Sequence, residues 1–243
     1  MTNRVDILSV PFDAVTLEEA VRKGLTLTQT GGRVVTPNPE IVWKCQTDPE
    51  TLKAVASADL ILADGVGIVR AAQTLKTPLP CRVAGVDWFF AMLGGCAETG
   101  KRVFLLGGKP GVAELAAKNA ETKYPGLTVC GTHDGYFTDA APVLETIKNA
   151  APDFLAVCLG APKQELWMAR NAEALSGVLM AGLGGSLDVL AGAKKLAPGF
   201  IRGIGLEWLF SAVLQPKRIP RLFVIPKFMR AVKKEAKRCA KAG

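Results

Sequence analysis

The most regular hydrophobic pattern in the chain lies between residues 154 and 192. Two apolar runs, 154–159 and 178–181, each end in a glycine-rich turn and lead into a helical pattern. Runs without polar positions are typical of strands that are buried on both faces of a parallel sheet. We therefore expect two successive strand–turn–helix units, with Pro162 at the start of one helix and Ser186 as the N-cap of the other.

The same alternation continues through the rest of residues 1–193. Apolar runs predict strands at 5–10, 33–36, 60–63 and 101–106, a short strand with a turn over 129–136, and a helix over 112–124. Thr16, with Glu19 three positions later, predicts a capped helix start. Strands that alternate with helices of about 10–15 residues predict an α/β fold with a mostly parallel sheet covered by helices.

Glycine-rich turns follow the two strands of the most regular region, at Gly160 and at Gly182, Gly184 and Gly185. Helix N-termini after such turns present free N–H groups at the sheet edge where α/β proteins bind phosphate-bearing ligands. The alternative is that these are ordinary tight turns between strand and helix. The polar cluster at 163–165 favours binding, because a purely structural turn needs no such cluster.

Two charged residues are placed where a site at this edge would need them. Asp64 follows a buried strand and precedes a glycine, which is the position expected of a general base. Its structural alternative is to cap the next helix. Arg82 lies close to Asp87 across a turn of small residues. It could be an exposed cation, or its guanidinium could bind a diphosphate.

Thr36 and Asn38 end another predicted strand, and Pro37 and Pro39 stiffen the backbone around them. One interpretation is turn formation and capping of a helix that starts near Pro39. The other is that these rigidly held hydrogen-bonding side chains contact a sugar or uracil.

Several classes of site lack their sequence signals. The 6 cysteines form no CxxC pair, and His133 is the only histidine, so neither a metal site nor a Ser-His-Asp or Cys-His site is expected. No GxGxxG motif opens the first unit, which argues against a nicotinamide-dependent dehydrogenase. No DxD motif, through which many nucleotide-sugar enzymes bind a metal ion, occurs in the chain. An enzyme of that class with this sequence would therefore neutralise the departing diphosphate with Arg, Lys and helix N-termini.

Positive charge is concentrated at the end of the chain. Of 30 Lys and Arg and 22 Asp and Glu, residues 194–243 hold 13 and 2, which makes this tail +11 and the remainder −3. Apolar residues at 222, 225, 229 and 232 recur at helical spacing among the basic ones. We expect a catalytic domain over 1–193 and, over 194–243, a basic amphipathic appendage that binds an anionic membrane surface. Nucleic acid is the rival partner, but no nucleic-acid-binding motif is present.

The N-terminal residues lack the apolar core of a signal peptide, and no apolar run is long enough to span a bilayer. We therefore expect a cytoplasmic protein that is peripheral on the inner face of the cell membrane. Self-association would cover the apolar side of the tail away from a membrane, although the sequence does not indicate a subunit number.

Five motifs occur in one order along the chain. They are TPNPE at 36–40, ADG at 63–65, GAPKQE.W at 160–167, GLGGSLD at 182–188 and GLEWLF…P.R..R at 205–221. Through these motifs the chain resembles the WecG/TagA/CpsF glycosyltransferases, glycosyltransferase family 26, along nearly its whole length. The resemblance implies a Rossmann-like α/β core with a C-terminal appendage that recruits the enzyme to the membrane.

The resemblance also implies a bacterial, inverting transferase that needs neither a metal nor a cofactor. Such enzymes move an N-acetylmannosamine-type sugar from a UDP donor to polyprenyl-diphosphate-linked N-acetylglucosamine, for surface polysaccharide or teichoic acid. The family's proposed general base falls on Asp64. Its pocket, substrate and diphosphate contacts fall on Thr36, Asn38, Arg82, Gln164, Arg218 and Arg221. Leu196 and Ser211 stand where the family often has arginine, and Lys195 or Arg202 are candidates to compensate.

Two alternatives remain open on the residues alone. The first is a nucleotide-dependent oxidoreductase on the same layered fold, which bound NAD(P) would reveal. The second is a basic-tailed adaptor for membrane or nucleic acid, in which replacement of Asp64 would leave function intact.

Overall fold

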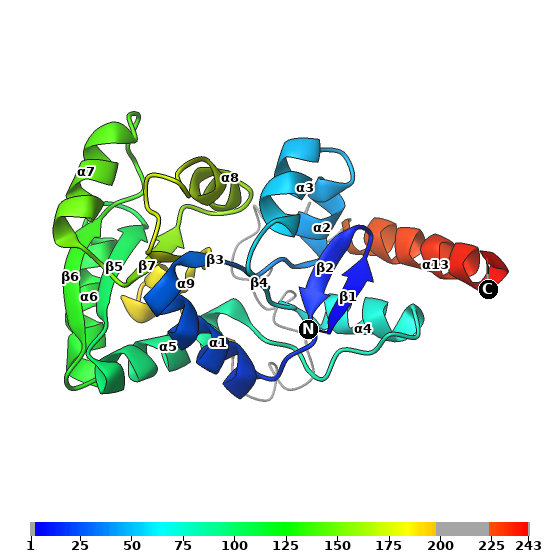
Figure 1. The fold of residues 1–243 in the computed structure, drawn as a ribbon, viewed down its shortest axis with the longest axis horizontal. Coiled ribbons are helices and arrows are strands. Elements are labelled where there is room, and N and C mark those ends of the chain that lie inside the picture. Colours follow the sequence, from blue (N-terminus) through cyan, green and yellow to red (C-terminus); the bar gives the residue numbers. More distant parts are fainter. Residues whose placement is uncertain (1–2, 198–223, 243) are drawn as a thin grey trace.

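The chain folds into three layers, in which a parallel sheet lies between two sets of helices. The structure is a computed structural model that describes residues 3–197 and 224–242 (Figure 1). The six strands run in the order β4-β3-β8-β7-β5-β6, and all their pairings are parallel. Their bounds are β3 Gly32–Val35, β4 Leu60–Ile61, β5 Arg102–Gly107, β6 Thr128–His133, β7 Phe154–Cys158 and β8 Leu179–Gly182. The predicted α/β, Rossmann-like fold is confirmed.

Both faces of the sheet are buried, which explains the apolar runs in the sequence. In β7, Leu155 and Val157 belong to one core cluster, whereas Phe154 and Ala156 belong to the other, and all four are fully buried. Successive side chains of a strand point to opposite faces, so a strand covered on both sides must be apolar at every position.

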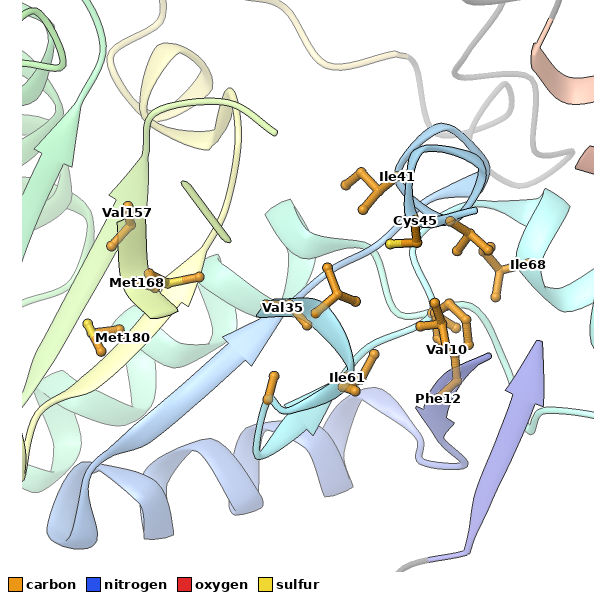
Figure 2. Packing of buried hydrophobic residues seen from close by; sticks show 14 of the residues in the cluster. Val10, Phe12, Val35, Ile41, Cys45, Ile61, Ile68, Val157, Met168 and Met180 are labelled. Carbon is orange, nitrogen blue, oxygen red and sulfur yellow. The ribbon is translucent and has the colours of Figure 1, made fainter. Parts of the chain in front are cut away.

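Helices on the two faces complete the core. One face is covered by α2 (Pro39–Cys45), α3 (Pro49–Ala56), α7 (Ala141–Ala150) and α8 (Lys163–Arg170), and the other by α1 (Leu17–Thr30), α5 (Gly85–Thr99), α6 (Val112–Lys123) and α9 (Ser186–Leu190). The first cluster extends beyond β4 to α4 (Val66–Thr74), to the β-hairpin formed by residues 4–13 and to α13 (Val224–Ala242) (Figures 1 and 2).

The predicted strand at 5–10 is wrong, because the chain reverses within it. β1 (Arg4–Ile7) pairs antiparallel with β2 (Val10–Asp13) and forms a separate two-stranded sheet. The turn between them holds Leu8 and Ser9 at φ values of 50° and 67°. Such turns usually carry Asn or Gly, so the apolar run gave no sign of a hairpin.

The predicted start of α1 is confirmed as a capping box. Thr16 Oγ1 accepts a hydrogen bond from Glu19 N (3.3 Å), and Glu19 Oε2 accepts one from Thr16 N (2.8 Å). Two of the N–H groups that helix formation leaves unpaired are thereby satisfied.

The helix that the structure describes in the tail, α13, packs on the rest of the protein. Phe228 and Val232 are fully buried in the first core cluster, and Glu235 Oε2 accepts a hydrogen bond from Leu8 N (3.2 Å). The apolar side of the helix is therefore already covered, which removes our reason for expecting self-association through it. The opposite side exposes Lys227, Arg230, Lys233, Lys234, Lys237 and Arg238. The division at residue 194 stays a prediction.

Candidate active site

The carboxyl ends of three neighbouring strands are aligned, and the predicted site residues follow them. Val35 of β3 lies opposite both Ile61 of β4 and Gly182 of β8. The pairing continues one step past β4, because Leu62 N donates to Val35 O (2.9 Å). The loops after these strands therefore begin side by side, at the edge where open α/β sheets bind their ligands.

Thr36 joins β3 to its neighbours. Its side chain is buried, and Oγ1 donates to the Gly182 carbonyl (3.0 Å). A Cβ at Gly85, the first residue of α5, would lie 2.9 Å from Thr36 Oγ1. Thr36 thus fixes how closely α5, β3 and β8 approach one another, and its contact with a ligand stays a prediction.

Asn38 is the N-cap of α2, as one of its two interpretations required. Its Oδ1 accepts hydrogen bonds from Glu40 N (3.0 Å) and Ile41 N (3.1 Å), and Pro39 occupies the first helical turn. The capping role is confirmed. The proposed sugar or uracil contact stays a prediction and would have to use the amide nitrogen, because the oxygen is engaged.

Asp64 lies in the loop between β4 and α4 and is half-buried. It does not hold the N-cap position of α4, which belongs to Gly65 and carries no side-chain capping bond. Asp64 therefore lies one residue before the N-cap position of this helix. The start of α4 packs against the segment that contains Asn38, since a Cβ at Gly67 would lie 2.6 Å from Pro39 Cγ and one at Gly65 would lie 3.7 Å from Pro39 Cδ.

Arg82 is brought next to this loop by the backbone. Val83 N donates to Ala63 O (3.0 Å). The backbone of Arg82, which precedes Val83, therefore runs next to that of Asp64, which follows Ala63. The Arg82 guanidinium pairs with Asp87 at 3.9 Å, and the two side chains are 19% and 28% exposed. This long, half-buried ion pair supports the predicted proximity of Arg82 and Asp87.

The cluster at 163–165 divides between surface and interior. Lys163 is exposed, and its Nζ lies 5.2 Å from the centre of the Phe137 ring. Gln164 and Glu165, by contrast, are 2% and 1% exposed. Burial is the main influence on Glu165 and raises the pKa of its carboxyl, although the hydrogen bond from Gln164 opposes this. Because it is enclosed by the protein, the Glu165 carboxyl is not placed to contact a substrate directly.

Gln164 bridges two of the predicted motifs. Its Oε1 accepts from Gly184 N (2.9 Å), and its Nε2 donates to Glu165 Oε1 (2.9 Å). The Gly184 N–H group is therefore engaged by the protein itself. Gly160 and Gly184 have φ values of 78° and 55°, which glycine adopts without strain, and each has open space where a Cβ would be.

The predicted Ser186 cap is wrong. α9 begins at Ser186 itself, after Gly185, and the Ser186 hydroxyl donates to Leu183 O (2.7 Å). α9 spans only 5 residues, so it contributes little helix dipole to the turn that precedes it.

Lys194, which the sequence placed only in the basic tail, supplies a further cation at the turn that contains Gly185. Lys194 Nζ pairs with Asp188 Oδ2 at 2.6 Å and lies 3.1 Å from where a Gly185 Cβ would be. The available signal was an acidic residue in α9 followed by a lysine just after the helix. The placement of Arg218 and Arg221 falls outside the described residues.

Metal and thiol chemistry find no support in the described part of the chain. Residues 3–197 and 224–242 contain no group of three or more His, Cys, Asp or Glu that could hold a metal ion. Burial raises the pKa of Cys45, Cys96 and Cys158 to about 12, which keeps these thiols protonated. His133 hydrogen-bonds through Nδ1 to Asp134 O (2.8 Å), as expected of a structural histidine.

A groove of about 500 Å³ lies between α1 and α5 and includes none of the predicted site residues. In the same described residues, no helix is long and apolar enough to cross a membrane.

Comparison with known proteins identifies the family of the chain. Residues 5–242 match the model of the glycosyl transferase WecG/TagA/CpsF family. Two relatives from Staphylococcus aureus strains NCTC 8325 / PS 47 and MRSA252 are 36% identical over 245 residues, which is 99% of this chain and 96% of each relative. Both are named N-acetylglucosaminyldiphosphoundecaprenol N-acetyl-beta-D-mannosaminyltransferase.

These matches span the whole described core and the tail, so they choose among the functions that the residues alone left open. They favour sugar transfer over the oxidoreductase and adaptor alternatives. The chain belongs to the WecG/TagA/CpsF family of glycosyl transferases.

Proposed function

We propose that the chain transfers an N-acetylmannosamine-type sugar from a UDP donor to undecaprenyl-diphosphate-linked N-acetylglucosamine, with inversion and without a divalent metal. The names of its relatives support the sugar and the acceptor. The observation that carries the proposal is the convergence of the loops after β3 and β4 with Arg82 around Asp64. The product would enter a cell-surface polysaccharide or teichoic acid.

In the proposed reaction, Asp64 accepts the proton of the acceptor hydroxyl while the oxygen of that hydroxyl forms a bond to the anomeric carbon of the donor sugar. The bond from that carbon to the diphosphate oxygen breaks on the opposite side, and UDP leaves with the electron pair. A positioned base contributes about 10²–10⁴-fold to such a step. Placing both substrates in line and stabilising the departing charge supply the larger share.

Charge on the departing UDP would be balanced by the chain's own groups. Arg82 and the N–H groups at Gly160 and Gly185 are the described candidates, and Arg218 and Arg221 are candidates outside the described residues. Gly184 is a weaker candidate than the sequence suggested, since its N–H already donates to Gln164. Metal independence rests on the absence of a DxD motif from the sequence.

Membrane association is proposed to be electrostatic. Because the buried residues of α13 face the protein, its exposed basic side is the surface that anionic lipid headgroups would meet. This would hold the enzyme at the inner face of the membrane, where a lipid-linked acceptor is available.

The test is UDP release in the presence of EDTA, with a panel of UDP-sugars and a short-chain N-acetylglucosamine-diphosphate lipid. Acceptor-dependent release by the wild type that collapses in Asp64→Asn is expected, and the active donor identifies the sugar. UDP release that requires added metal would contradict metal independence. UDP release by Asp64→Asn at the rate of the wild type would mean that another residue is the base.

A further inference from the structure

The most unusual buried group in the described structure is the Glu165 carboxyl. It is 1% exposed, and its Oε1 accepts a hydrogen bond from Gln164 Nε2 (2.9 Å). Its Oε2 is buried and has no hydrogen-bond partner within the described part of the chain. A buried polar oxygen without a partner costs about 1–3 kcal/mol. A glutamate at this position is therefore not explained by stability.

What Glu165 does contribute is the orientation of the neighbouring amide. Gln164 Oε1 accepts from Gly184 N, while its Nε2 donates to Glu165. If the amide were rotated by 180°, Nε2 would face the Gly184 N–H and Oε1 would face the carboxyl oxygen. A donor would then face a donor at Gly184, and an acceptor would face an acceptor at Glu165. The carboxyl and the backbone N–H therefore together select one orientation of the amide.

The orientation of Gln164 in turn affects the strand ends around the site. Gln164 lies 3.0 Å from where a Gly182 Cβ would be, and it holds the turn one residue beyond Leu183. The carbonyl of Gly182 is the acceptor for Thr36 Oγ1 (3.0 Å). A continuous set of contacts therefore runs from α8, through the turn after β8, to the end of β3.

We propose that Glu165 is a positioning residue, whose carboxyl fixes the Gln164 amide and thereby holds the 182–185 turn and Thr36 in the geometry that sugar transfer requires. The inference rests on the proposed function, because it assigns Glu165 to that same site. Glu165 acts through Gln164 and touches neither substrate.

The test uses the full chain and the UDP-release assay, at saturating donor and acceptor. Glu165→Leu removes the acceptor for Gln164 Nε2, whereas Glu165→Gln keeps an oxygen that can accept it. A misplacement of about 1 Å can cost on the order of 10²-fold in rate. We expect Glu165→Leu to lower kcat by about 10- to 100-fold and Glu165→Gln to restore it to within a few-fold of the wild type.

Two further measurements separate positioning from general destabilisation. Val55→Ala in α3, which packs against α8, is a matched core control whose melting temperature should fall while its kcat stays near that of the wild type. In a double-mutant cycle, adding Glu165→Leu to Gln164→Ala should lower kcat by less than about twofold, because the group that Glu165 orients is already absent.

The outcomes distinguish this inference from the proposed function. A wild type without acceptor-dependent UDP release would overturn the proposed function. An active wild type in which Glu165→Leu retains full kcat would overturn the positioning role alone. So would additive effects of Gln164→Ala and Glu165→Leu, or a loss in Glu165→Gln equal to that in Glu165→Leu.

Discussion

At the scale of single residues, two carboxyl groups of the site have opposite environments. Asp64 is half-buried in a loop at the edge of the sheet, whereas Glu165 is enclosed on the inner side of α8. A base must exchange its proton with substrate and solvent, but a group that only orients its neighbour can remain buried. The two environments therefore suit the two roles that we propose.

Replacement of Asp64 should affect the chemical step selectively. We expect Asp64→Asn to lower kcat by about 10²–10⁴-fold, with a small change in KM for the donor, because the amide cannot accept the proton. The matched control is Asp59→Asn, at the opposite end of β4, where the carboxylate accepts a hydrogen bond from Arg33 N (2.8 Å). Steady-state kinetics of both variants test this, and a comparable loss of kcat in Asp59→Asn would argue against a specific role.

Burial of Glu165 predicts a pH dependence of stability. Its pKa in the folded protein is raised above the ordinary value of 4.5. Between those two pKa values the folded state binds a proton that the unfolded state lacks, so the free energy of unfolding falls as pH rises. Glu165→Gln abolishes this titration and should gain stability over the wild type as pH increases above 4.5.

Thermal melts between acidic and alkaline pH measure this difference. Glu173→Gln, an exposed carboxyl beyond the end of α8, serves as the control and should follow the wild type. A constant difference between Glu165→Gln and the wild type at all pH values would contradict the predicted titration.

At the scale of elements, the sequence predicted best those strands whose burial leaves a complete apolar run. β5, β7 and β8 were placed to within one or two residues, and α6 to within one. The hairpin was missed because Leu8 and Ser9 occupy a turn that usually requires Asn or Gly. The burial of Gln164 could not be predicted either, since its partners Glu165 and Gly184 become neighbours only through the sheet topology.

The capping box of α1 provides a prediction at this scale that should not affect catalysis. Thr16→Ala removes the side-chain acceptor for Glu19 N and should lower the free energy of unfolding by about 1 kcal/mol. Thr26→Ala, at an exposed position of the same helix, should change it much less. Urea unfolding provides the values, and equal losses in the two variants would contradict a capping contribution.

At the scale of the whole molecule, the tail combines an anchor with a charged surface. The sequence pattern of α13 suits a helix on a membrane as well as a helix on a protein, because both need one apolar side. Phe228 and Val232 use that side for the protein core, beyond the β4 edge of the sheet (Figure 1). Between residues 224 and 240, where the structure describes burial, the exposed basic side chains are Lys227, Arg230, Lys233, Lys234, Lys237 and Arg238.

This arrangement predicts that membrane binding and stability can be separated within one helix. Changing Lys233, Lys234 and Lys237 together to Gln should weaken binding to vesicles rich in phosphatidylglycerol by at least about tenfold, without lowering the melting temperature. Binding of the wild type should also weaken as salt rises, because the attraction is screened. Phe228→Ala should instead lower the free energy of unfolding by about 3–5 kcal/mol, since it empties a buried site.

The charge-matched control changes Lys53, Lys118 and Lys148, which are exposed on α3, α6 and α7, together to Gln. Vesicle sedimentation compares the two triple variants, and equal losses of binding would mean that net charge, and not the exposed side of α13, determines binding.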